Sequence, residues 1–308
     1  MLTKVFVTGC SGFIGRNCAR ELSARGINVL GLDVAAMPEA NNWGISNFLQ
    51  VPVNAAALDD AVLRYGLPQF LIHCAGSGSV PASMLNPYAD FMANVQSVLE
   101  ILDFSRRNKS IVKIVLLSSA AVYGNISDCS LTESMTGKPA SPYGTHKKIM
   151  EDLASGYGRN FGVPCVCVRL FSVYGAGLKK QLLWDACQKA KLGDFSFFGN
   201  GSEERDWLHI SDAARLLILA AEYASPLVPV INGGTGYGRS IKDVLTILGK
   251  TWYPVITPEF TGQTRSGDPD RLIADISRLN DWGFKPNISL EQGIQGYVSW
   301  FKKQVCND

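Results

Sequence analysis

The stretch Lys4-Val5-Phe6-Val7-Thr8-Gly9-Cys10-Ser11-Gly12-Phe13-Ile14-Gly15 decides how this chain folds. Its first five residues form a short apolar run of the kind found in buried strands. Three glycines follow, and a helical pattern begins among them. In a strand–turn–helix unit the first glycine permits a tight turn, the second lets the backbone approach a pyrophosphate, and the third lets helix and strand pack closely. The stretch therefore predicts a dinucleotide-binding turn.

Strand-like and helical patterns alternate outward from this turn. Apolar runs predict strands at 4–8, 28–32, 70–73, 114–118 and 163–170, and amphipathic patterns predict helices near 14–24, 57–65, 88–106 and 142–160. Such alternation implies right-handed crossovers and a parallel sheet covered on both faces. We therefore expect an α/β protein with a Rossmann-type doubly wound sheet over 1–174. The looser pattern beyond predicts a smaller mixed α/β substrate region over 175–308, with some segments returning to the first domain.

Asp33 ends the second predicted strand, 18 residues after Gly15. A carboxylate at this place accepts hydrogen bonds from the adenosine ribose hydroxyls and repels a 2′-phosphate. No lysine or arginine follows within the next several residues to hold such a phosphate. The sequence therefore favours NAD over NADP as the cofactor.

Composition and charge narrow the class of protein. The 308 residues carry a formal net charge of +2, so we expect no nucleic-acid partner. No apolar run approaches the roughly 18 residues of a membrane helix and no signal-peptide pattern is present, which predicts a cytoplasmic protein without a membrane partner. The cysteines and histidines lack metal-ligand spacing, so we expect no metal, and we expect Cys165 and Cys167 to be buried thiols.

The stretch Ser141-Pro142-Tyr143-Gly144-Thr145-His146-Lys147 places a tyrosine and a lysine four residues apart, on one face of a helix. A tyrosine that acts as acid or base near pH 7 must have its pKa lowered by about 3 from its usual value of about 10. A cation about 4 Å away supplies roughly 4 kcal/mol at an effective dielectric of 20, which is enough. Lys147, helped by the nicotinamide charge, is therefore predicted to activate Tyr143. His146 faces elsewhere and is assigned no role.

Taken together, these motifs resemble the extended short-chain dehydrogenases/reductases of the NAD-dependent epimerase/dehydratase family. Further stretches that resemble this family are Leu117-Ser118-Ser119-Ala120-Ala121-Val122-Tyr123-Gly124, Arg169-Leu170-Phe171-Ser172-Val173-Tyr174-Gly175, Arg205-Asp206-Trp207-Leu208-His209-Ile210-Ser211-Asp212 and Arg265-Ser266-Gly267-Asp268. Because they run in order to the C-terminus, the resemblance covers nearly the whole chain.

The resemblance implies a role for each matched residue. Ser119 would bind the sugar oxygen that is oxidised, Tyr143 would move its proton, and Lys147 would also hold the nicotinamide ribose. The implied cofactor-binding residues are Gly9, Ser11, Gly12, Phe13, Ile14, Gly15, Asp33, Cys74, Ala75, Gly76, Tyr143, Lys147 and Phe171. The implied substrate-binding residues are Ser119, Ser172, Arg205 and Arg265, and the two arginines would grip a nucleotide diphosphate.

Three departures from the family pattern bear on the substrate. Ser172 stands where many UDP-sugar enzymes carry an asparagine, so UDP, GDP, CDP and dTDP sugars all stay open. Ala120 and Ala121 replace the acidic pair of 4,6-dehydratases, and methyl groups cannot shuttle protons, which disfavours that reaction. Pro52-Val53-Asn54 stands where the family often has an aspartate after its own third strand, so adenine would be held by backbone groups or by Asn54.

The resemblance leaves two reactions open, with a third and different class behind them. The first is a nucleotide-sugar epimerase, most simply a 4-epimerase acting through a 4-keto intermediate. The second is a reductase of a nucleoside-diphosphate 4-keto-6-deoxy sugar, which would use the same residues in one direction. A non-catalytic NAD-binding protein is disfavoured because Ser119, Tyr143 and Lys147 are all present. The resemblance also suggests a homodimer in which helices over 87–107 and 141–160 form an intersubunit four-helix bundle.

Overall fold

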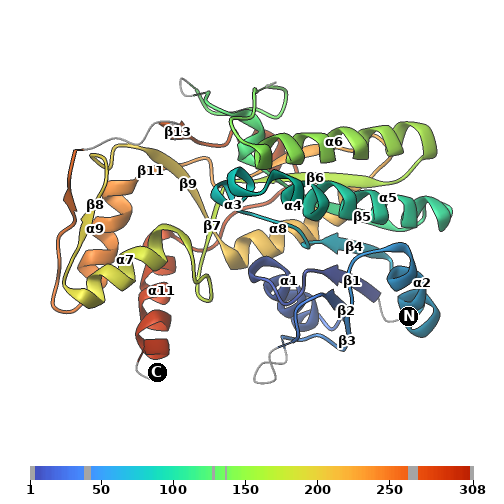
Figure 1. The fold of residues 1–308 in the computed structure, drawn as a ribbon, viewed down its shortest axis with the longest axis horizontal. Coiled ribbons are helices and arrows are strands. Elements are labelled where there is room, and N and C mark those ends of the chain that lie inside the picture. The colour runs from blue at the N-terminus through green and yellow to red at the C-terminus, as the bar shows by residue number, and fades with distance from the viewer. Residues whose placement is uncertain (1–3, 38–42, 127–128, 136, 263–269, 306–308) are drawn as a thin grey trace. The chain divides into compact units, whose positions relative to one another are not determined.

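The computed structural model describes residues 4–37, 43–126, 129–135, 137–262 and 270–305. The chain divides into two compact units. The first comprises 1–124, 136–170 and 213–232, and the second comprises 125–135, 171–212 and 233–308. The chain thus leaves the first unit after residue 170 and comes back to it at residue 213. Most elements of both units are labelled in Figure 1.

The first unit is built on a seven-stranded sheet with the order β10-β6-β5-β4-β1-β2-β3. Its strands are β1 (Lys4–Thr8), β2 (Asn28–Asp33), β3 (Asn47–Gln50), β4 (Phe70–His73), β5 (Lys113–Ser119), β6 (Cys165–Leu170) and β10 (Val230–Gly233). The pairings from β6 through β3 are all parallel. The direction of chain progression reverses beside β1, which has β2 on one side and β4 on the other. The predicted Rossmann-type sheet is confirmed.

Helices cover both faces of this sheet. The long ones are α1 (Phe13–Ala24), α2 (Ala55–Tyr65), α5 (Ser97–Arg107), α6 (Pro142–Phe161) and α8 (Ile210–Tyr223). One buried cluster joins α2, α5 and α6 to alternate strand residues such as Phe6, Leu71 and Ile114. That alternation follows from the period-two geometry of a strand, and it leaves the other face to α1 and the first-unit part of α8 (Figure 1).

The helix expected over 88–106 is interrupted. After the short helices α3 (Val80–Leu85) and α4 (Pro87–Phe91), a π-helical turn, η1 (Met92–Gln96), leads into α5. A π-turn adds one residue to the helical repeat and often occurs at functional sites. The other element at the site, α6, begins as its sequence predicts. The Ser141 side chain caps it by accepting a hydrogen bond from Gly144 N at 3.2 Å, and Pro142 occupies the first turn.

The second unit holds a smaller mixed sheet centred on β9 (Glu204–His209). Its partners are β11 (Gly238–Ser240), which is antiparallel, and β13 (Arg271–Leu272) and β7 (Ser172–Tyr174), which are parallel. Its other elements are the strand pair β8 (Ser196–Phe197) and β12 (Glu259–Phe260) and the helices α7 (Gln181–Leu192), α9 (Ile241–Thr251), α10 (Ser277–Asp281) and α11 (Leu290–Val305). Among the helices that the structure describes, none is long and apolar enough to cross a membrane.

Candidate active site

The glycine turn sits where β1 ends and α1 begins, at the carboxyl edge of the sheet. Gly9 has a φ of +65°, and a Cβ there would come within 2.5 Å of the Ala75 backbone nitrogen. A Cβ on Gly15 would lie 2.2 Å from the Gly9 carbonyl oxygen. No side chain caps the start of α1 at Gly12, so the first-turn N–H groups stay available to an anion. The turn has the shape needed to receive a pyrophosphate.

Asp33 ends β2 next to this turn. Its two carboxylate oxygens accept hydrogen bonds from Ser11 N at 2.8 Å and Ala35 N at 3.0 Å. These backbone donors fix the carboxylate beside the glycine turn while leaving further lone pairs for ligand hydroxyls. This is the place that the sequence predicts for a group that binds ribose.

The segment after β4 lies against the glycine turn. Cys74 N donates to Thr8 O at 3.1 Å, and Ala75 N donates to the Thr8 hydroxyl at 3.4 Å. Gly76 has a φ of +134°, and a Cβ there would approach Asn94 Oδ1 to 2.8 Å. The structure therefore brings the predicted cofactor residues 9–15, 33 and 74–76 together around the ends of β1, β2 and β4.

Ser119, Tyr143 and Lys147 lie in the same unit, Ser119 at the carboxyl end of β5 and the other two in the first turns of α6. Ser119 is the last residue of β5, and its hydroxyl accepts a hydrogen bond from Ala121 N at 3.2 Å. The Lys147 ammonium lies 5.8 Å from the centre of the Tyr143 ring and donates to Leu117 O at 2.8 Å. The helical spacing thus places both side chains on one face of α6, toward the carboxyl end of β5.

Burial dominates the electrostatics of this set. It raises the pKa of Tyr143, and the hydrogen bond with Ser119 opposes that rise. Burial lowers the pKa of Lys147 to about 8. The sequence predicts that Lys147 lowers the pKa of Tyr143 toward 7. Among the polypeptide's own groups, however, desolvation by burial prevails, and the pKa of Tyr143 stays above its usual value. A lysine whose ammonium is itself destabilised by burial is a weaker activator than spacing alone suggests.

A buried ion pair between Glu151 and Arg169, which the sequence did not predict, lies next to the elements that carry Ser119, Tyr143 and Lys147. Glu151, one turn after Lys147 on α6, accepts a hydrogen bond from the Ser118 hydroxyl at 2.6 Å. Arg169 at the end of β6 donates to both oxygens of Glu151, at 2.9 and 2.7 Å. The pair ties α6 to β6 and, through Ser118, to β5, the strand that ends at Ser119. The charged residues in an apolar helix face and strand were the available signal, but their 18-residue separation hid the pairing.

The remaining predicted substrate residues belong to the second unit. Ser172 begins β7 and pairs with Trp207 of β9. Arg205 lies on β9, where its guanidinium donates to Glu204 O at 2.9 Å. Phe171 N donates to Gly233 O at 3.1 Å. Arg265 lies outside the residues that the structure describes.

Two further side chains near the site, those of Asn54 and His73, form hydrogen bonds with neighbouring residues. Asn54 caps α2: its side-chain oxygen Oδ1 accepts a hydrogen bond from Ala57 N at 2.9 Å. That oxygen therefore already has a partner within the protein. His73 is buried between the hydroxyls of Thr8, at 2.7 Å, and Ser97, at 3.0 Å. Burial lowers the pKa of His73 to about 3, so the ring is neutral at ordinary pH. His73 is a packed core histidine, and Cys165 and Cys167 are buried thiols, as their sequence predicts.

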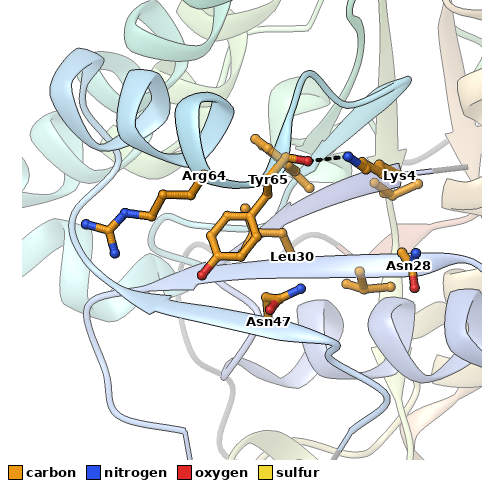
Figure 2. A pocket seen from close by; sticks show the side chains of 9 residues that line it. Lys4, Asn28, Leu30, Asn47, Arg64 and Tyr65 are labelled. Atoms are coloured by element: carbon orange, nitrogen blue, oxygen red, sulfur yellow. Dashed lines mark hydrogen bonds between the residues drawn. The ribbon is translucent and has the colours of Figure 1, made fainter.

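A hollow at the opposite edge of the sheet is shown in Figure 2. It is lined by residues that include Lys4, Asn28 and Asn47, which begin β1, β2 and β3, and Tyr65, which ends α2. Ligands of open parallel sheets bind at the carboxyl ends of the strands, whereas this hollow lies at their amino ends. It is therefore not the site of the residues described above.

Known proteins with this architecture include solved sugar-nucleotide enzymes. A UDP-glucose 4-epimerase of Thermus thermophilus, solved in complex with NAD, superposes with a TM-score of 0.87 at 26% identity, covering 97% of this chain and 99% of that one. The UDP-N-acetylglucosamine 4-epimerase of Methanobrevibacter ruminantium, in complex with UDP-N-acetylmuramic acid, gives a TM-score of 0.88 at 26% identity, covering 99% and 100%.

Sequence comparison gives relatives of the same kind. A putative UDP-glucose 4-epimerase of Methanocaldococcus jannaschii is 29% identical over 308 residues, which cover 97% of this chain and 98% of that protein. The sequence model of the NAD dependent epimerase/dehydratase family matches residues 5–232, which contain the glycine turn, Asp33 and the Ser119, Tyr143 and Lys147 set. The chain therefore belongs to the NAD-dependent epimerase/dehydratase family and is an NAD-dependent enzyme.

Proposed function

We propose that this enzyme is a nucleotide-sugar epimerase, most simply a 4-epimerase, that works through a 4-keto intermediate with Tyr143 as acid and base. The observation that carries the proposal is the gathering of Ser119, Tyr143 and Lys147 at the carboxyl edge of the sheet that also presents the glycine turn. Relatives named as epimerases of UDP-glucose and UDP-glucuronate, which align along almost the whole chain, support the reaction type.

NAD fits the first unit on grounds of shape and chemistry. The glycine turn leaves room that a Cβ would fill, and the uncapped start of α1 offers N–H groups to the pyrophosphate. Asp33 would hold the adenosine ribose, and Cys74, Ala75 and Gly76 would lie beneath the cofactor. Bound NAD supplies the acceptor and donor of hydride and, when oxidised, a positive charge that favours the Tyr143 phenolate.

The chain's own residues would manage the proton. The Ser119 hydroxyl would orient the sugar C4 oxygen, and Tyr143 would remove that oxygen's proton while C4 loses a hydride. Lys147 would stabilise the phenolate and hold the nicotinamide ribose. Once the 4-keto sugar has turned its opposite face to the site, Tyr143 would give the proton back to the C4 oxygen as C4 would regain the hydride from bound NAD, so that the epimer would form with no net redox change.

The substrate is proposed to be a nucleoside-diphosphate sugar held by Ser172, Arg205 and Arg265. Guanidinium groups match the geometry of phosphate oxygens and form bidentate, charge-assisted hydrogen bonds with them. Because Ser172 is shorter than the asparagine of many UDP-sugar enzymes, the nucleotide base stays open among uracil, guanine, cytosine and thymine.

We also propose that the enzyme is a homodimer. Large apolar side chains are exposed on α3, α4 and the junction between them: Met84 is 61%, Leu85 88% and Tyr88 73% exposed. Apolar side chains grouped on one surface mark an interaction site. Pairing of α5 and α6 with their copies, extended by this surface, would bury these side chains in an intersubunit four-helix bundle.

A product assay tests the reaction. The holoenzyme would be incubated with UDP-, GDP-, CDP- and dTDP-linked hexoses, and the C4 configuration followed by proton NMR. We expect one nucleotide series to reach an equilibrium of two C4 epimers without consumption of NAD. A 4-keto-6-deoxy sugar reduced with stoichiometric loss of NADH, and no epimer formed from any hexose, would establish the reductase instead.

A further inference from the structure

A buried carboxylate–imidazole pair that the proposed mechanism does not use lies beside the Tyr143 and Lys147 segment of α6. Asp90 on α4 is 4% exposed, and His146 on α6 is 9% exposed. The His146 Nδ1 and Asp90 Oδ2 atoms are 2.6 Å apart, a distance typical of a charge-assisted hydrogen bond. His146 directly precedes Lys147 in the chain and follows Tyr143 by three residues. The pair therefore adjoins the two groups that are proposed to handle the proton.

The neighbouring elements hold this pair in place. The Phe91 ring packs edge-on against the His146 ring with their centres 5.4 Å apart, and Asn94 Nδ2 donates to the Asp90 carbonyl oxygen at 3.2 Å. Tyr143 N donates to the Ser83 hydroxyl of α3 at 3.1 Å. The π-turn begins two residues after Asp90, so the helix changes its repeat where the carboxylate meets α6.

One oxygen of the buried carboxylate is left over. Asp90 Oδ1 has no hydrogen-bond partner among the residues that the structure describes. A buried carboxylate oxygen without a donor keeps its negative potential unscreened, and this potential acts on the nearest titratable groups. His146 is the nearest of these groups; Tyr143, about one turn before it on α6, and Lys147, the next residue, come under the same potential, and Asp90 raises the pKa of both.

Other groups also face this couple, but each acts on one member of it. The titratable groups around the Lys147 ammonium are Asp90 of α4, His73 of β4, Cys74 after β4, Cys167 of β6 and Glu151 of α6, of which the His73 ring is neutral and the two thiols have raised pKa values. Asp90 is the largest of the influences that oppose burial there. Tyr143 faces the Ser119 hydroxyl of β5 and, again, Asp90. Asp90 is thus the charge that both members share.

We propose that Asp90, oriented by His146, is a positioning residue whose buried negative charge keeps the Tyr143 and Lys147 couple protonated between turnovers. The inference rests on the proposed role of that couple in the epimerase. The carboxylate preserves the Lys147 cation that burial would otherwise discharge. It also holds the phenol neutral until the positive charge of oxidised NAD outweighs it, so the base forms only in the loaded enzyme.

The first test is the pH–rate profile of the holoenzyme. In Asp90→Asn, protons leave both Tyr143 and Lys147 more easily, so we expect the whole profile to move toward acid by about one pH unit. Asp90→Glu keeps the charge and should keep the wild-type profile even if turnover falls. Asp90→Ser is a second neutral variant in case the amide is poorly tolerated. Asp103→Asn, which removes an exposed carboxylate on α5, is the matched control and should leave the profile in place.

The second test needs no substrate. The phenolate absorbance of Tyr143 is isolated by subtracting the titration of the corresponding Tyr143→Phe protein, in the wild type and in Asp90→Asn. We expect the titration midpoint to fall in Asp90→Asn. If the Tyr143 titration midpoint falls in Asp90→Asn but the wild type shows no epimerase activity, the inference about Asp90 is supported and the proposed function is refuted. An active epimerase whose midpoint and profile are both unchanged in Asp90→Asn would overturn the inference and leave the function standing.

Discussion

Tyr143 is the residue on which the proposed chemistry depends most directly. Burial raises the pKa of its phenol, so the neutral side chain is the resting form and proton transfer requires the surrounding charges. Replacing it with phenylalanine removes the transferable proton and keeps the ring that packs near Lys147. We expect Tyr143→Phe to lower turnover at least about a hundredfold, the usual size for a positioned acid/base, and to leave the NAD dissociation constant unchanged. Near-normal turnover would exclude Tyr143 from the mechanism.

Asp33 is the residue that should select the cofactor. Its carboxylate is fixed by Ser11 N and Ala35 N, so it cannot easily swing away from a ligand phosphate. Two like charges about 4 Å apart repel by roughly 1–4 kcal/mol, depending on the local dielectric. We therefore expect NAD to bind at least about tenfold more tightly than NADP in a fluorescence titration, and Asp33→Asn to narrow that gap. Equal dissociation constants for the wild type would contradict the assignment.

At the scale of elements, the Glu151 and Arg169 pair links α6 to β6 and β5. Removing one partner of a buried ion pair leaves an uncompensated charge and costs about 3–5 kcal/mol. We expect Glu151→Gln to lower the free energy of unfolding in urea by an amount in that range. The partly exposed pair of Glu21 in α1 and Arg25, the C-cap of that helix, supplies the control, since Glu21→Gln should cost less than about 1 kcal/mol. Equal losses of unfolding free energy in Glu151→Gln and Glu21→Gln would show that the buried pair contributes no more to stability than the pair nearer the surface.

The helices on the α5 and α6 side of the sheet make a prediction about assembly. Leu85 and Tyr88 are among the most exposed apolar side chains of the first unit. If they are covered in a dimer, a charge there should weaken association without disturbing the fold. We expect the wild type to sediment as a dimer and Leu85→Glu to shift toward monomer with an unchanged melting temperature. Leu63→Glu, at an equally exposed leucine on α2, is the control. A wild type that is monomeric at all concentrations would refute the proposal.

At the scale of the whole molecule, the sequence predicts the first unit well because its signals are local. Apolar runs alternate with helical patterns, and the glycine turn fixes where the first crossover begins. The short edge strand β3 is missed because its four residues are at most half buried and carry little apolar pattern. The break at Met92–Gln96 is missed because a single π-turn of five residues is too short to stand out from the helical pattern on either side of it.

The same contrast between local and distant signals holds for the candidate site. Residues set by local spacing, such as Tyr143 and Lys147, can be predicted from the sequence alone. The partnership of Asp90 with His146 joins positions 56 residues apart, and no local pattern announces it. The balance of charge on Tyr143 cannot be predicted either, because it depends on how deeply the phenol is buried as well as on the nearby lysine.

The division into two units allows the substrate handle to be tested apart from the cofactor. Arg205 belongs to the second unit, whereas the proposed NAD residues belong almost entirely to the first. A charge-assisted contact contributes about 1.5–3 kcal/mol. Calorimetric titration of the four nucleoside diphosphates should show binding weakened about ten- to a hundredfold by Arg205→Ala, with NAD affinity intact. Arg278→Ala removes an exposed arginine of the same unit and serves as control. Loss of NAD binding in Arg205→Ala would point instead to a general structural role.

The return of residues 213–232 to the first unit governs when that unit can form during synthesis. The strand β10 neighbours β6 at the end of the sheet, and Cys167 N donates to Pro229 O at 3.0 Å. Until the ribosome has released the chain beyond residue 232, β6 is an unpaired edge with hydrogen-bonding groups open to other chains. We therefore expect nascent chains that stall before this point to leave that edge open to pairing with other chains, even though every residue of the glycine turn and of the Tyr143 helix has already been made.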